Sequence, residues 1–161
     1  MHAEFPKDVP PIIFYAINII KQLDFKYLWV DQLCIPKNCW ESQISEMDKT
    51  YRNAILTIVA AVQDAEFGLL GVGAMNRKRH APLILWVNGV NTGVQLLYSL
   101  YCALKDIIWA NCGWIFQEKA LSLRQLIFTK NNIYYNCLKG EMSEFNYHKS
   151  KKIKFTCGTF V

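Results

Sequence analysis

Asp31 is a carboxylate within an apolar run, YLWVDQLCI, at residues 27–35. We expect residues 26–31 to form a buried strand, because KYLWVDQ is short and rich in aromatic and branched side chains. Asp31 then lies at the carboxyl end of a parallel strand, where open α/β sheets bind their ligands. The alternative is local, with the carboxylate accepting hydrogen bonds from the amides of Leu33 or Cys34 in an Asx-turn. Both interpretations explain a charge beside a core strand.

Glu118 is the second candidate for chemistry. It follows Trp114 by one helical turn, and an aromatic neighbour desolvates a carboxyl group and raises its pKa, which suits a general acid or base. The alternative is a helix-surface carboxylate that pairs with Lys119 or Arg124 and stabilises the fold by only about 0.5 kcal/mol. An enzymatic role requires that Asp31 and Glu118 open into one cleft.

The cysteines and histidines argue against a thiol nucleophile and a metal site. Cys34 stands in an apolar run with no histidine near it in sequence, so we interpret it as a small core residue. The six cysteines form no CxxC pair, and His2, His80 and His148 are far apart. We therefore expect free thiols and no bound metal.

Two helices are expected in the first third of the chain. Residues 10–23 have apolar side chains at helical spacing after a first turn that contains proline. A longer helix is expected to begin near Cys39 and continue to Ala54, with Asn38 as its N-cap and Glu41 completing a capping box.

The longer helix connects the expected strand at 26–31 to a second strand within AILTIVAA, residues 54–61. Both segments have the composition of strands buried on two faces, so we expect parallel neighbours joined by a right-handed crossover. The alternation of helix and strand predicts an α/β fold. The later elements are expected to be strands at 83–89 and 95–101 with a turn between them, a helix over 107–122, and two strands within 124–137.

One hydrophobic core is expected to hold the large apolar residues of these elements. The chain has 161 residues, which suits a single domain with one core. The residues expected in that core are Trp29, Ile44, Met47, Ile58 and Trp114.

Composition limits the class of protein. With 52% hydrophobic and 19% charged residues, the chain is too apolar for a disordered protein. Its longest apolar stretch, at 54–62, is shorter than the roughly 20 residues of a membrane-spanning helix, and no secretory signal begins the sequence. We expect a soluble, cytoplasmic protein. The net charge of +5 comes largely from basic runs at 76–80 and 148–154, but without an aromatic platform or a recognition helix nucleic acid is not an expected partner.

Several long blocks of the sequence together resemble the fungal heterokaryon incompatibility (HET) domain. The blocks are YLWVDQLCI, ESQISEMDKTYRNAILTIVAA, GLLG and GWIFQEKALSLRQLIF, and the resemblance covers about residues 9–137. It implies a domain of fungal allorecognition, a form of innate immunity in which non-self is recognised during cell fusion and programmed cell death follows. The family is similar to Toll/interleukin-1 receptor domains, which have a flavodoxin-like α/β fold and some of which cleave NAD.

The resemblance implies a flavodoxin-like, mainly parallel sheet with flanking helices. It divides the chain into an N-terminal extension (1–8), a HET-like domain (9–140) and a basic C-terminal tail (141–161). No cofactor is implied, and NAD is a possible substrate. In that case Glu118 or Asp31 stabilises the cation that develops on the ribose. The match of QE to the family block implies Gln117 and Trp114 as ligand-binding candidates.

The chain also departs from the family pattern. Family members begin with a strand block resembling LSYVWG, which is missing here, so we expect an incomplete sheet with an uncovered edge. Lys37 replaces a common glutamine, and Cys112 and Ile115 replace an arginine and a threonine near the late tryptophan. We therefore expect weak or absent catalysis, and an interaction module that acts through protein partners or self-association.

Overall fold

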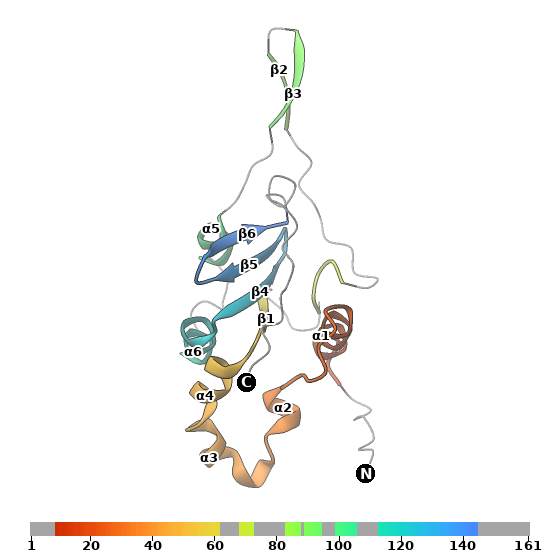
Figure 1. The fold of residues 1–161 in the computed structure, drawn as a ribbon. Coiled ribbons are helices and arrows are strands. Elements are labelled where there is room, and N and C mark those ends of the chain that lie inside the picture. The colour runs from red at the N-terminus through yellow and green to blue at the C-terminus, as the bar shows by residue number, and fades with distance from the viewer. Residues whose placement is uncertain are drawn as a thin grey trace.

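The computed structural model describes residues 9–61, 68–72, 83–87, 89–94, 99–105 and 113–144. Within this part the fold is mixed α/β, built on an open four-stranded sheet in the order β1-β4-β5-β6 (Figure 1). The strands are β1 (Thr57–Ala61), β4 (Arg124–Thr129), β5 (Ile133–Cys137) and β6 (Gly140–Ser143).

The sheet is mixed rather than mainly parallel, so that part of the expected fold is wrong. β1 pairs with β4 in parallel, whereas β4 with β5 and β5 with β6 are antiparallel. The reason is the length of the connections: residues 130–132 and 138–139 are tight turns, and a parallel pair needs a crossover of a dozen residues or more. The two strands expected within 124–137 are confirmed. The sheet continues through β6 to Ser143.

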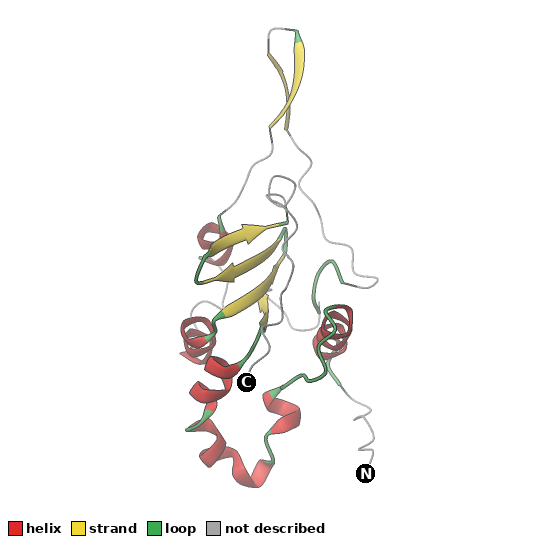
Figure 2. Ribbon diagram, viewed as in Figure 1, coloured by secondary structure: helices red, strands yellow, loops and turns green. Residues whose placement is uncertain are grey.

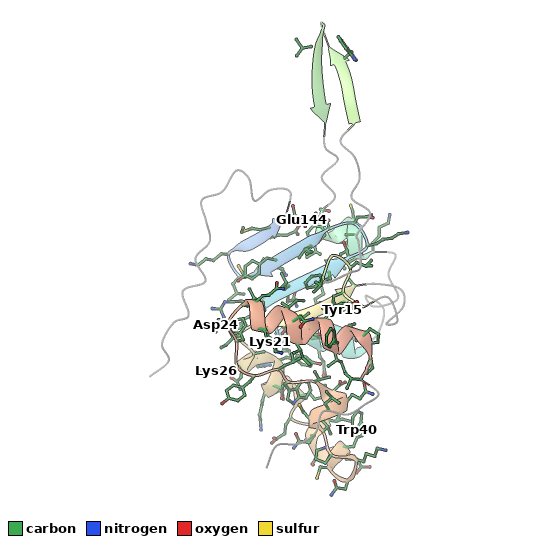
Figure 3. The ribbon with its side chains drawn as sticks, turned by 90° about the vertical axis from the view of Figure 1, so that its right-hand side faces the viewer. Tyr15, Lys21, Asp24, Lys26, Trp40 and Glu144 are labelled. Atoms are coloured by element: carbon green, nitrogen blue, oxygen red, sulfur yellow. The ribbon has the colours of Figure 1, made fainter. Side chains whose placement is uncertain are left out.

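Helices lie on both faces of the sheet (Figures 1 and 2). α1 (Pro11–Gln22) confirms the first expected helix and crosses one face, with Tyr15 and Lys21 on it and Asp24 and Lys26 just beyond its end (Figure 3). α5 (Leu100–Leu104) and α6 (Gly113–Leu121) lie on the other side.

The buried residues form two clusters, one on each face, rather than the single expected core. The first joins β1, β4 and β5 to Leu100 and Leu104 of α5. The second joins α1 to Leu69 and Phe128. Neighbouring strand residues point to opposite faces, and a sheet with helices on both sides therefore has two cores.

The residues predicted for one core have different environments. Met47 is buried, Ile44 and Ile58 are half-buried, and Ile58 packs against the cluster beneath α1. Trp29 is 38% exposed, so its assignment to the core is wrong. The side chain of Trp114 lies outside the described residues.

The expected strand at 26–31 is wrong. Residues 25–30 have no regular secondary structure and pair with no described strand, although Val30 has extended dihedral angles. Asp31 instead begins a short helix, α2 (Asp31–Cys34). An extended segment becomes a strand only when a neighbour satisfies its amides and carbonyls, and β1 pairs with β4 instead. The predicted parallel pair of 26–31 with 54–61 is therefore absent, although β1 itself is confirmed.

The long helix expected from Cys39 to Ala54 is broken into three pieces, η1 (Lys37–Cys39), α3 (Trp40–Ile44) and α4 (Met47–Asn53). Ser42 donates its hydroxyl to the Cys39 carbonyl at 3.0 Å, and Ser45 donates to the Ser42 carbonyl at 2.7 Å. Such side chains compete with the helical hydrogen bonds. The capping box expected from Asn38 and Glu41 does not form.

A hairpin forms here, but its second strand lies at residues 90–94, within the predicted turn, rather than at 95–101. β2 (Leu83–Val87) and β3 (Val90–Val94) are antiparallel, and Gly89 supplies the turn with a φ of +80°. The second strand was expected at 95–101, but 95–98 lie outside the described residues and Leu100 begins α5. Ser99 caps that helix by accepting the Cys102 amide at 3.3 Å. The helix expected over 107–122 is confirmed for 113–121, and residues 107–112 are likewise outside the described part.

Gly68 is a point of close contact between α1 and the segment 68–72, and it yields a stability prediction. Its φ is +62°, and a Cβ there would lie 2.6 Å from Cε2 of Tyr15. We expect Gly68→Ala to destabilise the protein by about 2–4 kcal/mol in urea unfolding, from backbone strain and overpacking together. In a Tyr15→Ala background the overpacking is gone, and the same substitution should cost only about 1 kcal/mol. Equal losses in the two backgrounds would contradict the contact.

Candidate functional site

A cleft of about 840 Å³ opens between α1, the segment 25–31 and the β1 side of the sheet. Apolar side chains make most of its lining, with Ile13 and Ala16 from α1 and Ile58 and Ala60 from β1. The polar groups that line it are Lys26, Tyr27, Asp31, Thr50, Tyr51, Asn53, Thr57 and Glu118.

Asp31 and Glu118 both line this cleft, as an enzymatic role requires. Asp31 is exposed, and its Oδ1 accepts the amide of the next residue, Gln32, at 2.6 Å. The amides of Leu33 and Cys34 donate to the Val30 carbonyl at 3.0 and 2.7 Å. The Asx-turn alternative, with the amides of Leu33 or Cys34, is therefore wrong.

Glu118 is half-buried on α6. Within the described part of the chain no ion pair joins it to a cation. Arg124, one of its expected partners, donates to the Ile55 carbonyl at 3.4 Å instead. Burial, followed by the negative charge of Asp31, raises the pKa of Glu118 to about 7. A carboxyl group poised near neutrality can exchange a proton under physiological conditions.

Tyr51, on α4, is the third polar group beside the two carboxylates. Its ring packs edge-on against Trp29, with centroids 6.3 Å apart and an interplanar angle of 78°. Burial, then the charges of Glu118 and Asp31, raise the pKa of Tyr51 to about 12. The phenol therefore stays protonated and can donate a hydrogen bond at the cleft.

Trp29, which was expected in the core, and Tyr51 both line the cleft, and the sequence pattern predicted this place for neither residue. The signal that could have indicated the cleft was Tyr51, because its phenol hydroxyl stands on the apolar face of the predicted helix. Its relation to Asp31 and Glu118 depends on the break between α3 and α4. That break was not expected.

Gln125 holds the end of α6, and with it Glu118, against the sheet. The side chain is 1% exposed, and its Nε2 donates to the carbonyls of Glu118 and Lys119 at 3.3 and 3.0 Å. Its Oε1 accepts from Asn136 on β5 at 3.1 Å.

The hydroxyls of Ser122 and Thr57 lie 2.8 Å apart. α6 therefore ends beside the amino end of β1, and Glu118 is not at the carboxyl ends of the strands, where ligand sites of open α/β sheets usually lie.

The other predicted site residues contribute less. Gln117 is exposed and is not among the residues that line the cleft, while the side chain of Trp114 lies outside the described part. Lys37 is exposed on η1, and the side chains of Cys112 and Ile115 are also outside it.

The cysteine interpretation is corrected in part. Cys34 is exposed rather than buried, with its Sγ 3.4 Å from the Val30 amide, because it lies on α2, a short helix that buries none of its residues. The four described cysteines are free thiols: Cys34, Cys39, Cys102 and Cys137. Among the described residues no group of three or more His, Cys, Asp or Glu could hold a metal ion. In the same part of the chain, no helix has both the length and the apolar composition to cross a membrane.

Comparison with known proteins identifies one family. The family Heterokaryon incompatibility protein (HET) matches residues 3–118, which is more than half of the chain. Searches of curated proteins and of solved structures gave no match. The matched region includes the cleft segment 25–31 and ends at Glu118. The chain therefore belongs to the heterokaryon incompatibility (HET) family.

Proposed function

We propose that the chain acts in fungal non-self recognition and programmed cell death, as a cytoplasmic interaction module. The supporting observation is a group of exposed apolar side chains at the cleft: Tyr27 is 90%, Ile55 46% and Trp29 38% exposed. Exposed aromatic and aliphatic groups that gather at a concave surface are typical of protein contact sites. The recognition event and the partner are part of the proposal.

This function predicts that expression of the chain in fungal cells reduces their viability, and that the cleft is responsible. Tyr27→Asp places a charge at the proposed contact and should abolish the effect, because contact sites depend on desolvated aromatic groups. Leu138→Asp is the matched control, since Leu138 is 88% exposed in the turn between β5 and β6 and does not line the cleft. Colony counts after induction measure the effect. Equal loss of activity in both variants would contradict a role for the cleft.

A second candidate function is hydrolysis of the nicotinamide–ribose bond of NAD. The observation that favours it is the shared cleft of Asp31 and Glu118. An anionic carboxylate stabilises the oxocarbenium-like cation that forms as nicotinamide leaves, and water then adds to the sugar carbon and loses a proton. The proton can pass to a carboxylate whose pKa lies near 7, as that of Glu118 does. A volume of about 840 Å³ is within the usual range for cofactor-sized ligands.

The glycohydrolase candidate predicts nicotinamide release from NAD by the purified chain, measured by chromatography. Glu118→Gln keeps the shape of the side chain and removes its charge, so it should lower the rate by about 100-fold or more. Glu41→Gln is the control, because Glu41 is exposed on α3 and does not line the cleft. Absence of turnover would leave the interaction module as the function, and turnover unchanged in Glu118→Gln would exclude Glu118 from the reaction.

The titration of Glu118 predicts how stability depends on pH. Its pKa is about 7 in the folded chain and close to 4.5 when unfolded, so between these values the folded state binds more protons. The stabilisation is complete below pH 4.5 and is lost as the pH rises through 7. From pH 5 to pH 8, the parent should lose on the order of 2 kcal/mol relative to Glu118→Gln.

Urea unfolding of both proteins across that pH range measures the difference. Glu41→Gln should follow the parent at every pH, because its side chain is exposed. Parallel pH profiles for the parent and Glu118→Gln would mean that Glu118 titrates as an ordinary surface carboxylate.

A further inference from the structure

The cleft is flanked by two stretches of chain that can both accept a further extended segment. On one side, no backbone hydrogen bond joins Lys26, Tyr27, Leu28 or Trp29 to another described residue. On the other side, β1 is the first strand of the sheet and pairs only with β4 among the described strands. Unpaired amides and carbonyls at a strand edge are a template for another strand.

The lining of the cleft matches one face of such a segment. Successive side chains of an extended chain point to opposite sides, so every second residue of an added strand would face the apolar groups of α1 and β1. Ile13, Ala16, Ile58 and Ala60 are among those groups, and none carries a charge. An occupant with apolar residues at alternate positions fits this surface.

Charge distinguishes one end of the cleft. Asp31 and Glu118 are the two acidic residues that line it, and Lys26 is the single cation among the described residues that do so. Trp29 and Tyr51 line the same cleft, with their rings in edge-on contact. A lysine or arginine side chain would meet two carboxylates there, and its apolar stem would lie against the aromatic pair.

We propose that the cleft accepts an extended segment of a partner protein as an added strand beside β1, with a Lys or Arg side chain of that segment between Asp31 and Glu118. Main-chain hydrogen bonds to β1 supply affinity. The apolar lining of the cleft and the two carboxylates supply selectivity. This inference rests on the proposed interaction module and names the chemistry of its partner.

Synthetic seven-residue peptides of alternating valine and threonine, with lysine at the first or the last position, are the probes. Two lysine positions are used because the segment can enter parallel or antiparallel to β1. Fluorescence polarisation measures their affinity for the full chain, and hydrogen exchange measures protection of the amides at 26–29 and 57–61. We expect one of the lysine peptides to bind and protect these two stretches, and we expect replacement of its lysine by glutamate to weaken binding at least tenfold.

Two further comparisons separate a strand in the cleft from unspecific binding. A proline at the centre of the peptide removes a donor and should abolish binding. Asp31→Asn combined with Glu118→Gln should weaken the lysine peptide at least tenfold, whereas Glu41→Gln should leave it unchanged. A thermal melt of each variant confirms that it is folded.

The proposal is overturned if neither lysine peptide binds at millimolar concentration, or if the glutamate peptide binds equally well. It is also overturned if protection appears only at β6, the strand at the opposite edge of the described sheet. It is also overturned if the chain alone forms a dimer that protects 26–29 and 57–61, since the occupant is then a second copy. Failure of the proposed function is a separate result. Loss of viability that depends on Tyr27, without peptide binding, would support the proposed function and reject the added strand. Peptide binding without any effect on viability would support the added strand and reject the proposed function.

Discussion

The parallel pairing of β1 with β4 is the interaction on which the rest of the structure depends. Thr57 and Ser122, which lie at the start of this pair, are 65 residues apart in sequence, so no local signal brings them together. Because β4 is also the first strand of the β4–β5–β6 meander, the pair joins both halves of the described chain. α6 ends where β4 begins and α4 ends just before β1. The pairing therefore brings Tyr51 and Glu118 to the same end of the sheet.

The cleft lies beside the other edge of β1, which pairs with no described strand. The segment 25–30 passes along the cleft without joining the sheet, and its aromatic side chains remain partly in water. A fully packed domain would bury such groups, at about 25 cal/mol for each Å² of apolar surface. Their exposure is therefore unfavourable for the isolated chain. A partner that buried them would gain the corresponding free energy on binding.

The same geometry accounts for the charge state of the site. Glu118 is half-buried on α6, which Gln125 holds in place, and the negative charge of Asp31 acts on it as well. Both effects favour the protonated form. A cation in the cleft, whether a basic side chain or the ribosyl cation of a nicotinamide nucleotide, would restore ionisation. The two proposed functions thus use one electrostatic property.

Local patterns in the sequence determined the elements whose hydrogen bonds are local. The apolar spacing of residues 10–23 predicted α1, and the turn chemistry between Thr129 and Asn132 predicted the β4–β5 hairpin, which those two residues close with bonds of 2.7 and 3.0 Å. The long sequence blocks also identified the family. For α1 and the hairpin, the deciding contacts lie within a few residues of one another.

Only the tertiary structure decided the rest. Residues 26–31 have the composition of a strand but pair with no described strand. The helix expected after Cys39 is broken, and serine hydroxyls there donate to the carbonyls of Cys39 and Ser42. The sequence indicated Asp31 and Glu118 as acids in apolar surroundings. That they line one cleft together with Tyr51 depends on the long-range pairing of β1 with β4. Strand identity and a carboxyl pKa both depend on what lies alongside, and neighbours in space are not encoded by neighbours in sequence.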